Sequence, residues 1–173
     1  MGASSGKTGE ARTIVYRKPR LMDASGIHSL VLSSKPLDVN SLYSYLLLTA
    51  HFDDTCIVAE LDGEIIGYTS AYVHPKKNAT LFIWQAAVME RVRKQSVGVS
   101  MLMHLLKRPG LSSISWLEAT VNPSNTGSVC LCHSLARKLN AACRTSVFFP
   151  RDLFGGQPHE EEVLFKIGPF SLH

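Results

Sequence analysis

Apolar and polar positions along the chain recur with two different periods, and each change of period marks the boundary of a predicted element. Residues 13–18 alternate between apolar and charged side chains, which predicts a short first strand. A helix is predicted next, because Ile27, Leu30 and Val31 have the i, i+3, i+4 spacing of one buried face. Asp23 precedes this segment and has a side chain suited to cap the helix N-terminus.

A second helix is predicted over residues 42–49, which are apolar nearly all the way round the helix. Residues 38–41, Asp-Val-Asn-Ser, supply the polar side chains that cap a helix start. Because this segment has almost no polar face, we expect the helix to be enclosed between other elements.

The period changes to that of strands after residue 55. Residues 56–61 and 64–73 are strand-like and flank Asp62-Gly63, a dipeptide that favours the positive φ angles of a tight hairpin turn. After a loop over residues 74–79, the apolar run 81–88 predicts a further strand. The middle of the chain is therefore predicted to be a hairpin followed by a third strand.

The second half of the chain alternates between predicted helices and strands. A helix over residues 99–107, ended by Pro109-Gly110, has a buried side formed by Val97, Met101, Leu102, Leu105 and Leu106. The segments that follow are a strand 114–121, a helix 126–139, and strands 145–149 and 163–167. The element order β-α-α-β-β-β-α-β-α-β-β, without internal repeats, predicts an α/β fold.

Composition and charge limit the number of domains and the partners. The chain has 173 residues, 45% of them hydrophobic, which is enough for one domain with its own core. We expect a flexible segment, 1–12, and one domain, 13–173. The net charge of +4 arises wholly from residues 1–20, and the remainder carries 13 basic and 13 acidic side chains. A neutral folded part lacks the basic field of a nucleic-acid binder, so no nucleic-acid partner is expected.

The sequence also argues against membranes and secretion. No stretch approaches the roughly 20 continuous apolar residues of a membrane span. Residues 1–10 are rich in Gly and Ser and lack the apolar region of a secretory signal. The expected location is therefore the cytoplasm, without membrane association.

Neither the cysteines nor the acidic run near the C-terminus has the spacing of a metal site. Cys56, Cys130, Cys132 and Cys143 contain no CxxC pair, and we expect buried free thiols. Residues 159–162, His-Glu-Glu-Glu, lack the HExxH spacing that places two imidazoles on one helix face. No metal cofactor is expected.

The turn that precedes the third predicted helix has the features of a phosphate site. A strand leads into residues 91–98, Arg-Val-Arg-Lys-Gln-Ser-Val-Gly, and then directly into a helix. The first N–H groups of a helix are unpaired and lie at the positive end of its dipole, so they favour anions. Ser96 and Gly98 keep the turn slim, and its basic side chains add positive charge. The alternative is an ordinary exposed turn with solvated cations.

Residues 93–98 resemble the acetyl-coenzyme A signature (Gln/Arg)-x-x-Gly-x-(Gly/Ala) of the GCN5-related N-acetyltransferases, with Ser96 in place of a family glycine. Residues 125–132 are similar to the family's Asn-x-x-Ala-x-x-Leu-Tyr stretch, with Cys132 in place of the tyrosine that often protonates the leaving thiolate. The resemblance covers about residues 13–168. It implies a mixed sheet of about six to seven strands flanked by about four helices, and acetyl-CoA as co-substrate.

The resemblance also implies which residues bind acetyl-CoA. In this fold the acetyl-bearing arm pairs like an added strand with the splayed end of the strand 81–88, where a backbone N–H faces the thioester oxygen. Ordinary sheet pairing is the alternative for that strand end. The implied cofactor-binding residues are Ala86, Ala87, Val88, Arg93, Lys94, Gln95, Ser96, Val97, Gly98 and Asn125.

Four other segments, residues 38–43, 51–56, 59–65 and 82–85, resemble the L-2,4-diaminobutyrate acetyltransferases of ectoine biosynthesis. This resemblance implies acetylation of the γ-amine of L-2,4-diaminobutyrate to the N4-acetyl compound. Acetyltransferases for ornithine, lysine or a polyamine, and a non-catalytic acetyl-CoA sensing module, are the alternatives.

Such a diamino acid needs anions for its ammonium groups, and the residues expected to bind it are Asp38, Tyr43, Trp84 and Glu162. Three of these have a structural alternative: Asp38 as a helix cap, Trp84 as a core side chain, and Glu162 as part of a solvated loop over residues 159–162.

The ammonium must lose a proton before it attacks, and Glu162 is the expected catalytic residue, with Glu161 the next choice. We expect direct attack on the thioester without an acyl-Cys132 intermediate. A homodimer is expected, because Phe148-Phe149 and Leu153-Phe154 are apolar and adjoin a predicted loop.

Overall fold

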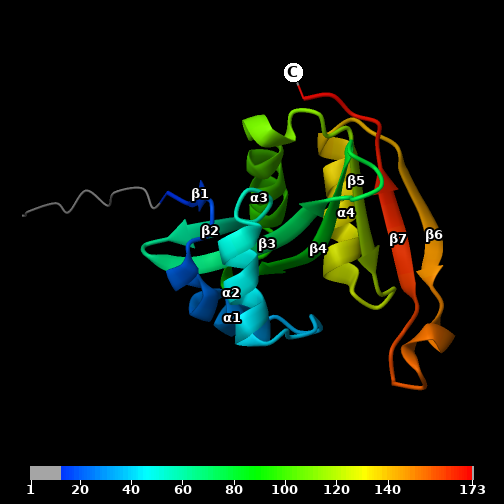
Figure 1. The fold of residues 1–173 in the computed structure, drawn as a ribbon, viewed down its shortest axis with the longest axis horizontal. Coiled ribbons are helices and arrows are strands. Elements are labelled where there is room, and N and C mark those ends of the chain that lie inside the picture. Colours follow the sequence, from blue (N-terminus) through cyan, green and yellow to red (C-terminus); the bar gives the residue numbers. More distant parts are fainter. Residues whose placement is uncertain (1–12, 173) are drawn as a thin grey trace, which may run out of the picture.

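Seven strands form one mixed sheet in this computed structural model, which describes residues 13–172 (Figure 1). In sheet order the strands are β1 (Val15–Arg17), β2 (Ile57–Leu61), β3 (Glu64–Val73), β4 (Thr80–Val88), β5 (Trp116–Val121), β7 (Glu162–Ile167) and β6 (Cys143–Phe149). Neighbours are antiparallel except for β4 and β5, which are parallel. The predicted α/β class, strand number and element order are confirmed. The segment predicted to be flexible, 1–12, lies outside the described residues.

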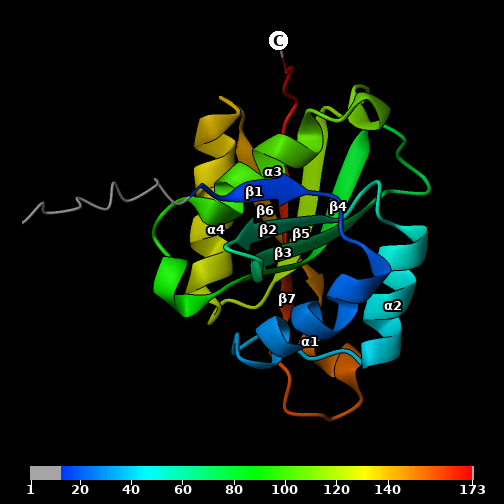
Figure 2. The same cartoon turned by 90° about the vertical axis from the view of Figure 1, so that its left-hand side faces the viewer.

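Four α-helices cover the two faces of the sheet (Figure 2). One face is covered by α1 (Ala24–Leu32) and α2 (Leu42–His51), and the other by α3 (Val97–Leu106) and α4 (Thr126–Lys138). The apolar positions predicted to face the core from α1 and α3 are buried in the structure. Helical spacing identified these positions because both helices lie on the sheet with one face each.

The hairpin between β2 and β3 turns at the predicted dipeptide. Asp62 and Gly63 have φ angles of 52° and 81°, the left-handed conformation that a two-residue hairpin turn requires. The strand β3 then begins at Glu64.

The parallel strands β4 and β5 separate after four residue pairs, and this separation creates the space for a site. Their pairing runs from Thr80 opposite Trp116 to Ile83 opposite Ala119. The strand β4 continues to Val88 along β3, whereas the rest of β5 pairs with β7. The end of β4 therefore has one paired edge, toward β3, and diverges from β5 on the other.

The prediction that α2 is enclosed on all sides is wrong. Ser41 caps the helix by accepting a hydrogen bond from the Ser44 backbone N–H (3.3 Å), as the cap chemistry of residues 38–41 indicated. Only one side of α2 is buried, with Tyr45 at its centre, whereas Leu42, Tyr43 and Leu46 are exposed. The helix packs on α1 at the margin of the layer, so its outer apolar face has no neighbour among the described residues.

Asp23 does not cap α1 with its side chain, contrary to the sequence prediction. Its carboxylate accepts hydrogen bonds from the Arg20 backbone N–H (2.6 Å) and from the Arg17 guanidinium (2.7 and 2.9 Å). Arg17 also pairs with Glu60, so β1, β2 and the start of α1 are joined by ion pairs. Burial opposes the charged form of Asp23, but its bonds to Arg17 and Arg20 outweigh burial and lower its pKa.

The four cysteines are free thiols, but only two of them are buried. Cys56 and Cys132 are inside, Cys143 is half-buried and Cys130 is exposed. The prediction of four buried thiols holds for Cys56 and Cys132, holds in part for Cys143 and is wrong for Cys130. Residues two apart on a helix point to nearly opposite sides, so Cys130 faces outward where Cys132 faces inward.

Candidate functional site

A cavity of about 260 Å³ lies where β4 and β5 separate. Five parts of the chain line it: the loop before α2, the second half of β4, the end of β5 with the turn after it, one side of α4, and the start of β7. The lining residues are Pro36, Leu37, Asp38, Asn40, Ile83, Trp84, Gln85, Ala86, Ala119, Thr120, Val121, Asn122, Asn125, Ser128, Leu131, Cys132, Leu135 and Glu162.

Glu162 is the carboxylate inside the cavity. It is the first residue of β7, its side chain is 15% exposed, and it is hydrogen-bonded to the side chains of Thr120 and Asn122. Burial raises its pKa, although the Thr120 hydrogen bond and nearby His159 act in the opposite direction. A carboxylate with a raised pKa is a better proton acceptor than an ordinary surface one. Glu161 does not line the cavity.

A second carboxylate, Asp38, lies at the mouth of the cavity, with His159 between the two. Nε2 of His159 is 3.8 Å from Oδ2 of Asp38 and 3.9 Å from Oε1 of Glu162. The Asp38 side chain is 91% exposed, and the cap of α2 is Ser41. The helix-cap alternative for Asp38 is therefore excluded, and its charge is free to face a ligand.

A buried chain of hydrogen bonds holds the backbone of the Asp38 loop against β4. The Tyr45 hydroxyl donates to Oε1 of Gln85 (3.1 Å), and Nε2 of Gln85 donates to the Asp38 carbonyl (2.8 Å). The Asn40 N–H in turn donates to the Tyr45 oxygen (3.4 Å). The position of the Asp38 backbone is thus set by a polar side chain in the middle of an apolar strand.

The two aromatic residues predicted to bind substrate lie in different places. Trp84 lines the cavity and is 52% exposed, which excludes the core alternative. Tyr43 is 67% exposed on the outer face of α2 and does not line the cavity.

The end of β4 has the geometry that the resemblance implied for the cofactor arm. Ala86, Ala87 and Val88 pair with β3 on one edge, and beyond Ile83 the other edge has no register with β5. Side chains alternate there, so Ala86 faces the cavity while Ala87 is buried against α1 and α2. The open edge of β4 fits an extended ligand that adds itself as a strand.

The turn before α3 contains two residues in the left-handed conformation, Lys94 (φ 63°) and Ser96 (φ 60°). This explains why the related motif has glycine at the Ser96 position, since glycine adopts this conformation without strain. Arg93 is fastened by its Nε, which donates to the Val88 carbonyl (3.1 Å), and Gln95 donates to the Arg91 carbonyl (3.3 Å). The turn exposes the unpaired N–H groups that start α3, an arrangement suited to phosphate.

Three further residues of the predicted cofactor set lie at the start of α3 and of α4. Gly98 allows α3 to approach α4, because a Cβ there would lie 3.2 Å from Cδ1 of Leu131. Val97 is buried beside it. Asn125 caps α4 by accepting a hydrogen bond from the Ser128 N–H (3.1 Å) with Oδ1, and it lines the cavity. The residues present therefore fit a ligand that combines a pyrophosphate with an extended arm.

Cys132 lines the cavity, but its environment disfavours the thiolate. Burial, with a smaller effect of Cys143, raises the pKa of the Cys132 thiol to about 12. The neighbouring His133 faces away to the ring of Phe165, at a centroid distance of 5.8 Å. A thiol of this kind is not an activated nucleophile.

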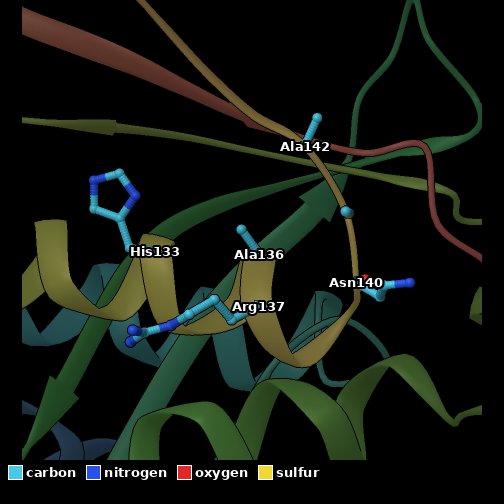
Figure 3. A pocket seen from close by; sticks show the side chains of 6 residues that line it. His133, Ala136, Arg137, Asn140 and Ala142 are labelled. Atoms are coloured by element: carbon cyan, nitrogen blue, oxygen red, sulfur yellow. The ribbon is translucent and has the colours of Figure 1, made fainter.

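A second hollow, of about 660 Å³, lies at the C-terminal end of α4 (Figure 3). It is shallow and open, and it is lined by His133, Ala136, Arg137, Asn140, Ala141 and Ala142. It contains no carboxylate and does not border the free edge of β4. The larger hollow is therefore a weaker candidate than the smaller cavity.

Across residues 13–172 the structure contains no group of three His, Cys, Asp or Glu side chains that could hold a metal ion. In the same range, no helix is long and apolar enough to cross a membrane.

Several polar residues of the cavity or its rim were not among the predicted site residues: Asn40, Gln85, Thr120, Asn122, Ser128 and His159. Gln85 carried a signal, since it is one polar residue within an apolar strand. His159 itself had no predicted role at the site, because its place beside Asp38 depends on a contact between residues 121 positions apart.

Comparison with known proteins gives a consistent result. Residues 25–135, more than half of the chain, match the model of the Acetyltransferase (GNAT) family. The L-2,4-diaminobutyric acid acetyltransferase of Bordetella parapertussis is 44% identical over 156 residues, covering 90% of this chain and 84% of that protein. The protein of the same name from Shouchella clausii is 41% identical, covering 90% and 87%.

Among solved structures, the diaminobutyrate acetyltransferase of Paenibacillus lautus, in complex with its substrate L-2,4-diaminobutyric acid and coenzyme A, has a TM-score of 0.89. The two proteins are 36% identical, and the match covers 94% of this chain and 99% of the Paenibacillus protein. The chain therefore belongs to the GNAT acetyltransferase family and, within it, to the L-2,4-diaminobutyric acid acetyltransferases.

Proposed function

We propose that this protein transfers the acetyl group of acetyl-CoA to the γ-amine of L-2,4-diaminobutyrate, a step of ectoine biosynthesis. The observation that carries the proposal is that one cavity contains two carboxylates, Glu162 and Asp38, and also borders the free edge of β4. The relatives that are 41–44% identical bear the name of this activity.

In this proposal the carboxylates of Asp38 and Glu162 hold the two ammonium groups of the substrate. Trp84 supports the charge with its ring face, because a half-exposed indole that borders a cavity can accept a cation. Tyr43, exposed and away from the cavity lining, stays a prediction from the sequence.

Glu162 is the proposed catalytic residue. An alkyl ammonium with a pKa near ~10 is almost wholly protonated at pH 7, so a base must remove a proton before the amine attacks the thioester. Glu162 is inside the cavity, and burial raises its pKa toward that of the group it must deprotonate. Direct attack is favoured over an acyl-enzyme, because the raised pKa of the Cys132 thiol keeps it protonated.

Acetyl-CoA is the proposed co-substrate and supplies the activated acetyl group. The residues that would hold it are the backbone of Ala86 to Val88 and the turn 93–98, with Asn125 at the start of α4. The two left-handed residues of the turn and the unpaired N–H groups of α3 favour the pyrophosphate.

The test is thiol release from acetyl-CoA with L-2,4-diaminobutyrate, ornithine, lysine or spermidine as separate acceptors. NMR of the product locates the acetyl group. The expected result is a preference of orders of magnitude for diaminobutyrate, with the acetyl group on N4. Preference for spermidine would contradict the substrate assignment, and cofactor binding without turnover would indicate a sensing module.

A pair of variants tests the role of Glu162. Glu162→Gln keeps the size of the side chain and is expected to lower kcat by about 10²–10⁴-fold, the usual contribution of a general base. Glu161→Gln is the matched control, because this residue is one position away and does not line the cavity. An equal loss in both variants would refute the assignment.

We also propose a homodimer in the cytoplasm. The edge strand β6 exposes Val147, Phe148 and Phe149, and Leu153 follows with 69% of its surface exposed. A partner copy that covers this apolar edge would remove it from water. The free thiols agree with a reducing compartment. Light scattering coupled to size-exclusion chromatography tests the dimer, with Phe148→Glu expected to shift it toward monomer.

A further inference from the structure

We infer that His159 is a proton-relay residue, which takes from Glu162 the proton lost by the substrate ammonium and passes it to solvent. The inference rests on the proposed function, in which Glu162 is the first acceptor. It starts from the position of the ring, whose Nε2 lies between the carboxylates of Asp38 and Glu162 at 3.8 and 3.9 Å.

The hydrogen bond of the other ring nitrogen, Nδ1, fixes the tautomer of His159. Nδ1 of His159 is 2.6 Å from the backbone carbonyl of Glu160. A carbonyl oxygen only accepts hydrogen bonds, so Nδ1 must carry a proton. In the neutral ring, Nε2 is therefore an unprotonated acceptor that faces the two carboxylates. This is the atom to which Glu162 can pass a proton.

The ring is held in this orientation rather than free to rotate. Phe154, in the short helical turn Arg151–Phe154, stacks on His159 with the ring centroids 3.9 Å apart and the planes inclined by 13°. The carbonyl of Glu160 fixes one edge of the same ring. The side chain is nevertheless 24% exposed, so a proton on it can reach water. A buried base with a solvent-exposed neighbour is the arrangement that a relay needs.

Charged groups approach His159 from several elements. Asp38 approaches from the loop before α2 and Glu162 from β7, and both are acidic. Glu160 is next in sequence, but its carboxylate is turned to the Ser124 N–H (3.2 Å). Arg151, from the turn that carries Phe154, is near enough to influence Glu160. The unprotonated Nε2 thus lies within 4 Å of two carboxylates that come from different elements, one of them inside the cavity.

The relay is a sequence of proton transfers without a redox step. The ammonium N–H bond breaks and an O–H bond forms on Glu162. That proton then moves to Nε2 of His159, which restores the carboxylate and leaves an imidazolium. The imidazolium releases the proton to water before the next turnover. Nε2 of His159 and Oε1 of Glu162 are 3.9 Å apart, which is longer than a hydrogen bond. The proton therefore crosses through one bridging water, or the two atoms move closer when the substrate binds.

The test compares the pH profiles of kcat and kcat/KM for acetyl transfer to diaminobutyrate between pH 5.5 and 9. His159→Asn keeps an amide N–H at the position of Nδ1 but lacks Nε2, so the bond to the Glu160 carbonyl can persist. It is expected to lower kcat at pH 7 at least tenfold and to change KM for the amine less than threefold. The deficit is expected to shrink toward pH 9, where hydroxide accepts the proton.

Two controls separate a relay from a structural role. His133→Asn alters a histidine that lies outside the cavity, and its pH profile is expected to match the unaltered protein. In His159→Ala, imidazole added to the buffer is expected to restore several-fold of the lost kcat, because a diffusible base replaces the missing ring. A purely structural role would give no rescue by imidazole. If His159→Asn does not fold, His159→Gln is measured in its place.

A readout independent of turnover is the ¹⁵N NMR spectrum of the His159 ring. Protonated Nδ1 and bare Nε2 in the neutral ring are expected, and the opposite tautomer would overturn the inference. So would a kcat within twofold of the unaltered protein in His159→Asn. Failure of the proposed function is recognised separately, since the unaltered protein would then not acetylate diaminobutyrate at all.

Discussion

Replacing Tyr45 by Phe removes one hydroxyl from the centre of the hydrogen-bond chain that links α2, β4 and the loop before α2. The hydroxyl donates to Oε1 of Gln85 at 3.1 Å and accepts from the Asn40 N–H at 3.4 Å. The bond to Gln85 is buried, so water cannot replace it, whereas the Asn40 N–H is partly exposed. Losing this buried bond and leaving Oε1 of Gln85 without its donor is expected to cost about 1–2 kcal/mol of unfolding free energy. For a chain of this length, the melting temperature is expected to fall by about 2–8 °C.

Gln85→Met tests the same chain of hydrogen bonds by changing the partner of Tyr45. This change also removes the bond from Nε2 of Gln85 to the Asp38 carbonyl (2.8 Å), so we expect a loss of about 2–3 kcal/mol. Each single variant already removes the hydrogen bond between Tyr45 and Gln85. The double variant is therefore expected to lose about 1 kcal/mol less than the sum of the two single variants.

Urea unfolding followed by circular dichroism measures the three free energies at constant m-value. The KM for the amine is expected to rise in Gln85→Met, because the backbone of Asp38 loses its anchor, while coenzyme A affinity stays the same. Additive free energies, to within about 0.3 kcal/mol, would refute the coupling through this hydrogen bond.

The remaining predictions concern pH and packing. Because the pKa of Glu162 is raised, kcat/KM is expected to fall on acidification at a higher pH than an ordinary carboxylate would give, and a pH–rate profile measures this midpoint. Gly98→Val is expected to destabilise the protein by about 1–3 kcal/mol in urea unfolding, because even the Cβ would meet Leu131 at 3.2 Å. Asp23→Asn is expected to cost about 1–3 kcal/mol at pH 7 by breaking its pair with Arg17. Since folding lowers the pKa of Asp23, this difference is present above about pH 4 and is lost as the pH falls through the lowered value.

Two errors of prediction have a common physical origin. The apolar side chains of α2 and the thiol of Cys130 were expected to be buried, yet Leu42, Leu46 and Cys130 are exposed. Hydrophobicity shows that a side chain benefits from burial, but it does not show whether a neighbour is present to cover it. Correct positions, such as the buried face of α3, lie on helices that pack one face on the sheet.

The sequence by itself determined the elements, their order and the positions of the hairpin turn and the basic turn before α3. These features depend on local periodicity, on turn residues such as Asp62-Gly63 and on helix caps, all of which act within a few residues. Motif resemblance also indicated the cofactor region, because its residues are contiguous.

Only the tertiary structure decided how the cavity is composed. The separation of β4 from β5, the anchoring of the Asp38 loop by Gln85 and the placement of His159 between Asp38 and Glu162 all join residues far apart in the chain. Such contacts depend on how the layers pack, and a local pattern carries no information about which distant side chain will lie opposite.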